Sequence, residues 1–170
     1  MALILNIETS TAVCSAALTE GEKVLFEQHS FEGPSHASLL GVYVEKMIQW
    51  VKSQGRQLDA VAVSSGPGSY TGLRIGVSVA KGLCFGADIP LISVSTLSLL
   101  ASSAVRKMQG AVDYQYCSMI DARRMEVYAE LFDASLQPIR TAMADIVDAQ
   151  TYANYLERGK VCFFGDGAAK

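Results

Sequence analysis

The stretch DAVAVSSGPGSYTGLRIG, residues 59–76, reads as a strand, a turn and the start of a helix in direct succession. Its first part, residues 59–65, is a short apolar run, which predicts a buried strand. Gly66, Pro67 and Gly68 predict a sharp turn, and the residues from about 73 to 85 repeat apolar side chains at helical spacing. A strand followed at once by a helix is the unit from which α/β proteins are built.

The glycines of this stretch do not match the common nucleotide-binding loops. A P-loop requires GxxxxGK[ST], and no lysine follows Gly72. A dinucleotide fold requires GxGxxG after the first strand, whereas Gly66, Gly68 and Gly72 give GxGxxxG after a later one. We therefore expect the first glycines to shape the turn and the hydroxyls of residues 69–71 to cap the helix.

The helix that follows is apolar around most of its circumference. On a helical wheel, one apolar face consists of Gly72, Gly76, Val79 and Leu83. A second apolar face adjoins it, and only a narrow polar strip remains. Because one sheet covers only one side of a helix, the other side needs a cover of its own. We predict that this helix is both core and contact surface; the alternative is that a neighbouring helix of the same chain covers it.

The segments around this stretch follow an α/β plan. Short apolar or alternating runs predict strands at 2–8, 13–19, 24–31, 59–65 and 89–94. Helix patterns lie at 34–55, at about 73–85, and from Ser95 or Thr96 to about 106, with Pro34 and Ser35 as start signals of the first. The resulting order, βββαβαβα, is that of a ribonuclease H-like domain with a mixed sheet and helices on its faces.

The second half of the chain begins the same order again. Strands are predicted at 114–120, 126–132, 135–140 and 160–165, and a helix at 145–157. This predicts a first ribonuclease H-like domain over residues 1–108 and the start of a second over 109–170. Such a tandem pair is the architecture of the actin-like ATPase and sugar kinase superfamily. The second copy stops at Lys170 before its remaining helices, so we expect a shortened protein or a fragment.

Composition sets limits on the function. Of 170 residues, 50% are hydrophobic and 18% charged, with a net charge of −3, as in a globular protein with a packed core. There is no basic stripe, so nucleic acid is expected only through a partner. The four cysteines lie far apart, which favours buried thiols in a reducing compartment over a metal or disulfide framework. With neither a signal peptide nor a membrane span in the pattern, we expect a cytoplasmic protein.

Four segments of the sequence resemble a known family. They are LNIETST at 5–11, PSHASLL at 34–40, GPGSYTGLRIGVSVAKGL at 66–83 and IDARRMEVYAELF at 120–132. Together they resemble the glycoprotease-like family of bacterial tRNA threonylcarbamoyladenosine biosynthesis proteins, which belongs to the superfamily named above. The resemblance spans essentially the whole chain.

The resemblance implies a non-catalytic partner protein in tRNA modification. Such members bind and activate a TsaD-like paralogue, which carries the metal and transfers the threonylcarbamoyl group to adenosine of tRNA, and a TsaE-like ATPase joins them. tRNA is then reached only through the complex. Contact through the first two helices is implied, and their apolar side predicts a homodimer when the chain is alone. The predicted interface consists of His36, Leu40, Tyr43, Met47, Gly72, Gly76, Val79 and Leu83.

A metallopeptidase-like enzyme is one alternative. The metal ligands of the paralogue include two histidines four residues apart on a helix, but here His36 is followed four residues later by Leu40. The other histidine, His29, falls in a predicted strand. We therefore predict no metal, and a packed or interfacial role for His36.

An ATP-dependent phosphotransferase is the other alternative. Enzymes of the superfamily position phosphates and Mg²⁺ with a DxGT-type hairpin in each lobe; here Glu8 and Ser10 stand where the first Asp and Gly are expected. In the second hairpin Asp121 is present, but Arg123 replaces the glycine. Both sites depart from the pattern, so we predict no catalytic residue and no intrinsic cofactor. Weak ATP or ADP binding at Glu8, Thr9 and Ser10, completed by a partner, stays open, and Gly165 and Gly167 lie where the superfamily contacts adenosine.

Overall fold

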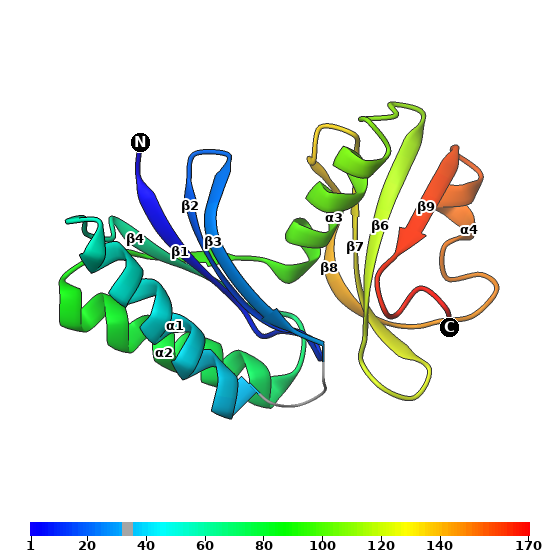
Figure 1. Ribbon diagram of the computed structural model, residues 1–170. Helices are drawn as coiled ribbons and strands as arrows, with labels where there is room; N and C mark the ends of the chain where they lie inside the picture. Colours follow the sequence, from blue (N-terminus) through cyan, green and yellow to red (C-terminus); the bar gives the residue numbers. More distant parts are fainter. Residues whose placement is uncertain (32–35) are drawn as a thin grey trace. The chain divides into compact units, whose positions relative to one another are not determined.

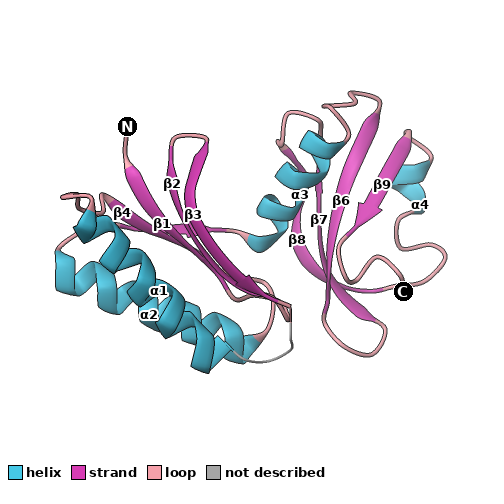
Figure 2. Ribbon diagram, viewed as in Figure 1, coloured by secondary structure: helices cyan, strands magenta, loops and turns pink. Residues whose placement is uncertain are grey.

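A computed structural model describes residues 1–31 and 36–170, which form two compact units, Met1–Val94 and Ser95–Lys170. We describe each by itself as unit 1 and unit 2. Each has its own β-sheet, as Figure 2 shows. The predicted start signals Pro34 and Ser35 of the first helix lie outside the described residues.

Unit 1 is a five-stranded mixed sheet with two helices on one face (Figure 1). Its elements are β1 (Leu3–Glu8), β2 (Cys14–Glu20), β3 (Lys23–Ser30), α1 (His36–Ser53), β4 (Ala60–Ser64), α2 (Tyr70–Ala87) and β5 (Leu91–Val94). The strand order is β3-β2-β1-β4-β5, in which β1 to β3 form an antiparallel meander and β4 and β5 run parallel to β1. All predicted strands and helices of this half are confirmed.

The core of unit 1 follows from the alternation of apolar side chains in β1 and β2. Leu3, Leu5 and Ile7 point to the same face of the sheet and are buried beneath α1 and α2, while the residues between them are only partly buried. Because successive side chains of a strand point to opposite faces, a period of two buries one face only. The helices therefore cover a single apolar face.

Unit 2 is a four-stranded mixed sheet. Its elements are α3 (Thr96–Lys107), β6 (Tyr114–Asp121), β7 (Glu126–Phe132), β8 (Pro138–Ile146), α4 (Ala153–Leu156) and β9 (Lys160–Phe164). The strand order is β8-β7-β6-β9, with β9 parallel to β6. The order βββαβαβα, followed by a second βββαβ, is thus present as predicted.

Helix α3 packs within unit 2, whereas the sequence placed it in the first domain. Its Ala101 is fully buried together with Tyr116 of β6 and Phe132 of β7. The division by packing accordingly falls between Val94 and Ser95, and not near residue 108. Helix α3 follows the last strand of one sheet and precedes the first strand of the other in the sequence. Its amphipathic pattern does not indicate which of the two sheets it will cover.

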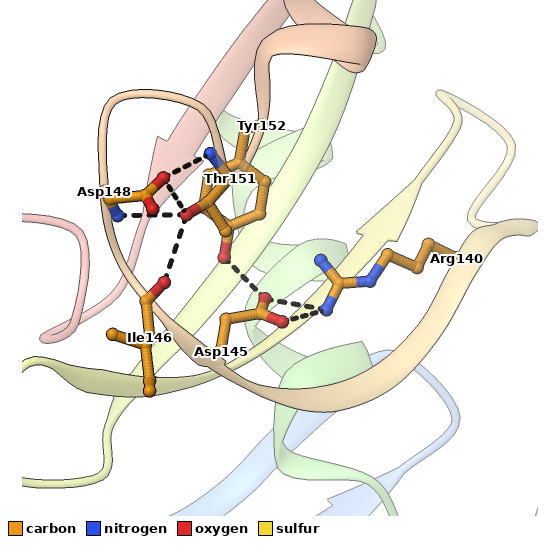
Figure 3. Close-up of polar contacts among 6 residues, drawn as sticks. All are labelled: Arg140, Asp145, Ile146, Asp148, Thr151 and Tyr152. Carbon is orange, nitrogen blue, oxygen red and sulfur yellow. Dashed lines mark hydrogen bonds and ion pairs between the residues drawn. The ribbon is translucent and has the colours of Figure 1, made fainter.

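The predicted helix over 145–157 is wrong in its first half, because local and tertiary hydrogen bonds hold residues 145–152 in another conformation (Figure 3). Ile146 still pairs with β7. After it, the Asp148 carboxylate accepts the backbone N–H groups of Gln150 and Thr151, both at 2.8 Å. An Asp that bonds the backbone two residues on favours a turn over a helix, so only the short α4 forms.

A partly buried ion pair fixes the same segment to its sheet (Figure 3). Arg140 Nη2 lies 2.6 and 2.7 Å from the two carboxylate oxygens of Asp145, and Tyr152 donates its hydroxyl to Oδ2 at 2.8 Å. Burial, together with that hydrogen bond to Asp145, raises the pKa of the Tyr152 hydroxyl. This hydroxyl is therefore a neutral donor at physiological pH and holds the loop before α4 on the sheet.

Candidate functional site

The first predicted hairpin site lies where β1 ends, and each oxygen of its carboxylate accepts a hydrogen bond from unit 1. Glu8 Oε1 accepts the backbone N–H of Ser10 at 2.6 Å, and Oε2 accepts the hydroxyl of Ser64 at the end of β4. Ser64 is itself buried. A catalytic carboxylate needs an oxygen that faces a ligand, whereas Oε1 of Glu8 bonds to the turn after β1 and Oε2 bonds to the parallel strand β4.

Thr9 and Ser10 are buried beneath the start of α2. Thr9 is fully buried and donates its hydroxyl to the carbonyl oxygen of Gly72 at 2.8 Å. The carbonyl oxygen of Ser10 accepts the backbone N–H of Ser69 at 2.6 Å, while Ser69 caps α2 by accepting the N–H of Gly72 with its own hydroxyl. The predicted capping role of Ser69 is thereby confirmed.

The glycines of the GPGSYTGLRIG stretch allow this close approach. A Cβ at Gly68 would lie 2.3 Å from the carbonyl oxygen of Ser10, one at Gly72 would lie 2.1 Å from that of Thr9, and one at Gly76 would lie 2.3 Å from Thr9 Oγ1. Real Cβ atoms essentially never come so close. The close contacts at Gly68, Gly72 and Gly76 therefore seat α2 directly on the end of β1.

One polar atom of this region has no partner. Ser10 Oγ is buried and makes no hydrogen bond within the described parts of the chain. The side chain is only 1% exposed, so a ligand could reach it only if the α2 contact opened. With Glu8 engaged and Thr9 and Ser10 covered, these residues do not fit a phosphate-binding hairpin.

The second predicted hairpin site joins β6 to β7. Asp121 Oδ1 accepts the backbone N–H of Arg123 at 2.6 Å and the ammonium group of Lys170. The Lys170 hydrogen bond, and then that from Arg123, holds the pKa of the Asp121 carboxyl below its usual range. Asp121 is exposed, but its Oδ1 is already used by groups of the same chain.

Arg123 adopts a backbone conformation that favours glycine. Its φ is 72°, and that of Arg124 is 52°, both in the left-handed region that side chains disfavour. The hairpin thus keeps its bend while a long side chain replaces the open backbone that phosphate needs. This placement agrees with the predicted departure from the DxGT pattern.

Gly165 and Gly167 pack against the end of β6. A Cβ at Gly165 would lie 2.0 Å from the carbonyl oxygen of Met119, and one at Gly167 would lie 3.0 Å from the carbonyl carbon of Ile120. Asp166 between them accepts the N–H of Asp121 at 2.9 Å. These glycines close a turn onto the sheet.

His36 is a packed residue at the start of α1. It is 6% exposed, and its Nε2 lies 3.3 Å from the carbonyl oxygen of Val13, to which it can only donate. Within residues 1–31 and 36–170, no three or more His, Cys, Asp and Glu side chains gather in a way that could hold a metal ion. The cysteines are free thiols.

The eight residues predicted as a partner interface lie inside unit 1, which corrects the predicted contact surface. Leu40 and Met47 are fully buried, and His36 and Tyr43 nearly so, in the core between α1, α2 and the sheet. Gly72 and Gly76 face Thr9, and Val79 and Leu83 pack on the same core. The helical wheel correctly placed the α2 residues of this set on one face. The prediction that this face is a contact surface was wrong, because periodicity does not indicate which face of a helix packs on the sheet.

The outward face of the helix pair carries different residues. On α2 the exposed stripe includes Arg74, Ser78, Lys81, Gly82 and Phe85. Phe85 is 93% exposed, and a Cβ at Gly82, Gly86 or Gly41 would meet open space. Small residues beside an exposed aromatic ring suit a close helix contact with another protein. In the sequence, this contact surface was indicated by Gly82 and Gly86, which the helical-wheel prediction did not include.

The two sheets, each starting with a three-stranded meander, define a tandem ribonuclease H-like α/β protein, as predicted. Over residues 31–160 the chain matches the family described as "TsaD: tRNA N6-adenosine threonylcarbamoyltransferase", and it belongs to this family. The resemblance drawn from the sequence is confirmed. Among the described residues, no helix combines the length and the apolar character needed to cross a membrane.

Similar proteins carry a more particular name. "tRNA threonylcarbamoyladenosine biosynthesis protein TsaB" of Escherichia coli is 39% identical over 74% of this chain and 52% of its own length, and that of Haemophilus influenzae is 36% identical over 74% and 51%. The solved structure described as "YeaZ from Pseudomonas aeruginosa" superimposes with a TM-score of 0.74 at 27% identity, covering 96% of this chain and 84% of that one. The chain spans about half the length of the curated relatives it matches.

Proposed function

We propose that this chain acts as a non-catalytic partner in tRNA threonylcarbamoyladenosine biosynthesis, where it binds and activates a TsaD-like catalytic paralogue. The relatives named TsaB support the pathway. The observation that carries the non-catalytic role is the engagement of both hairpin carboxylates, Glu8 and Asp121, by groups of the same chain. A phosphotransferase would need these oxygens for metal and phosphate.

The surface proposed for the partner is the outward face of α1 and α2. Gly82 and Gly86 leave room for a second helix to approach α2 closely, and Phe85 can enter a pocket on the partner. On α1, Gly41 and the 43% exposed Val42 continue this face. When the paralogue is absent, a second copy of the chain is expected to cover the same face.

The wider assembly follows the family. A TsaE-like ATPase is proposed as the third protein of the complex, and tRNA is expected to bind only through it, because the chain has a net charge of −3 and no basic stripe of its own. The proposed location is the cytoplasm, where tRNA is modified.

A reconstitution with the TsaD-like paralogue tests this function. We expect the wild-type chain to co-purify with the paralogue and to raise threonylcarbamoyladenosine formation on tRNA. Gly82→Arg and Phe85→Glu should weaken association by at least about tenfold, since an interface centre contributes roughly 2 kcal/mol or more per anchor. Ser103→Arg, which adds the same charge as Gly82→Arg at an exposed position of α3, is the control.

Two results would contradict different parts of the proposal. If Gly82→Arg and Phe85→Glu bind as tightly as Ser103→Arg, the outward helix face is not the interface. If the chain alone turns over ATP with Mg²⁺, and Glu8→Gln abolishes that turnover, the non-catalytic role is wrong.

A further inference from the structure

A cavity of about 540 Å³ lies at the C-terminal ends of α1 and α2, away from the hairpin sites. It is lined by Ile48, Val51, Lys52, Gly55, Arg56, Gln57, Leu58, Leu83, Ala87 and Ile89. Its volume falls within the roughly 300–1,000 Å³ of pockets that hold small molecules. No step of the proposed function uses it.

The walls of this cavity are preformed. At the end of α1, the N–H of Gly55 bonds to the carbonyl of Lys52 at 3.0 Å and that of Arg56 to Val51 at 3.1 Å, with Gly55 at a φ of 64°. At the end of α2, the N–H of Ile89 bonds to the carbonyl of Cys84 at 3.1 Å. Helix ends closed in this way hold their terminal side chains in place.

The interior of the cavity is apolar. Ile48, Leu58, Leu83 and Ile89 are only partly buried, and each packs on the core of unit 1 from the cavity side. Their remaining exposed surface faces water in the free protein, and a ligand with a hydrocarbon body would remove it from water.

The charged side chains that line the cavity are cations, and one of them is paired with a nearby carboxylate. The lining residues include two cations, Lys52 and Arg56, and no carboxylate. Arg56 makes one side-chain hydrogen bond in the described chain, from Nη2 to Glu20 Oε1 at 2.5 Å, which leaves its other N–H groups to donate elsewhere. Lys52 is exposed and has no ion pair among the described residues.

We propose that this cavity is a binding site for a small amphipathic monocarboxylate, with its hydrocarbon chain between Ile48, Leu58 and Leu83 and its carboxylate at Lys52 and Arg56. The cationic rim selects the anionic head group, and the apolar walls select the chain. Arg56 is positioned for this by its bond to Glu20.

Octanoate binding to the full chain tests the site, by calorimetry and by methyl chemical shifts of the lining Ile and Leu residues. We expect saturable binding, with affinity rising by about fourfold per added methylene from hexanoate to octanoate. Octanol and octyltrimethylammonium, which share the chain but not the anion, should bind more weakly. Equal affinity for octanol and octanoate, or no saturable binding, would overturn the proposal.

Three variants locate the site. Ala87→Trp fills the cavity from its exposed rim and should abolish binding. Lys52→Gln should weaken octanoate by about two- to fivefold, as for an exposed ion pair, and leave octanol unchanged. Lys46→Gln removes an exposed lysine of the same helix outside the cavity and is the control. Unchanged octanoate affinity in Ala87→Trp would place the binding elsewhere and refute this site.

Discussion

Adding a single methyl group at Gly76 and at Gly82, both in α2, is predicted to change the stability of unit 1 in opposite directions. A Cβ at Gly82 meets open space, so Gly82→Ala should gain the helix propensity difference, about 1 kcal/mol. A Cβ at Gly76 would lie 2.3 Å from Thr9 Oγ1. The same propensity gain is then opposed by a steric clash in the core.

The size of the opposing effect follows from the surroundings of Thr9. Overpacking a core costs about 1–3 kcal/mol. If Thr9 rotates away, its fully buried hydroxyl loses the bond to the Gly72 carbonyl, which costs about 1–3 kcal/mol more. After subtraction of the propensity gain, Gly76→Ala should lower the free energy of unfolding by about 1–5 kcal/mol.

A double-mutant cycle isolates the contact. Thr9→Ala removes Oγ1, after which the nearest atoms to the new Cβ, Ile7 Cγ2 and the Cβ of residue 9, lie at 3.5 Å, an ordinary van der Waals distance. In the Thr9→Ala background the clash is absent, so Gly76→Ala should stabilise the protein by about 1 kcal/mol, as Gly82→Ala does. The expected coupling between Thr9 and Gly76 is therefore at least about 2 kcal/mol.

Urea unfolding monitored by tryptophan fluorescence provides the measurement. Trp50 is the single tryptophan of the chain and lies in α1, with its ring centroid 6.4 Å from that of Phe26, so its signal reports on unit 1 alone. If Gly76→Ala stabilises the protein as Gly82→Ala does, or if the coupling with Thr9 is zero, then α2 does not sit on Thr9 as described.

Three further predictions concern unit 2. Asp145→Asn should destabilise it by about 1.5–3 kcal/mol, because the partly buried Arg140 then loses its charged hydrogen-bond acceptor; thermal unfolding by near-ultraviolet circular dichroism measures this, and Asp113→Asn, from an exposed pair with Lys160, should cost less than about 1 kcal/mol. Arg123→Gly should raise the unfolding free energy by about 1 kcal/mol, because the backbone φ of 72° suits glycine; a loss of stability in the same thermal assay would contradict it. Burial raises the pKa of the Cys117 thiol to about 12, so iodoacetamide at pH 8 should leave it unmodified until urea unfolds the unit; mass spectrometry of peptides would reveal early modification, which would refute this protection.

The sequence was informative about the elements of this fold and less so about their faces. Alternation in residues 2–8 and helical spacing after Gly68 are local patterns, and the structure has the strand and the helix there. Which side of α2 meets the sheet depends on Thr9, a residue distant in sequence, so the wheel could not determine it. The outward Gly82 and the inward Gly76 look alike in the sequence.

The misplaced helix over 145–157 has a similar physical origin. The pattern there is amphipathic, but Asp145 is held by Arg140 of the same strand, β8, and Asp148 closes a turn on Thr151. Side-chain bonds of this kind override a helical period without leaving a periodic signal of their own. The prediction for the two hairpin sites, in contrast, depended on residue identity. The departures from the DxGT pattern at Glu8 and Arg123 are visible in the sequence itself.

The bond between Thr9 and Gly72 also bears on how the chain folds while it is being made on the ribosome. The two residues are 63 positions apart, so β1, among the first segments to emerge, can pair with β2 early but stays uncovered until α2 has been synthesised. Leu5 and Ile7 on its inner face are exposed during that interval. Nascent chains that stall before residue 72 are therefore the ones we expect to engage chaperones, and release beyond α2 should end that engagement.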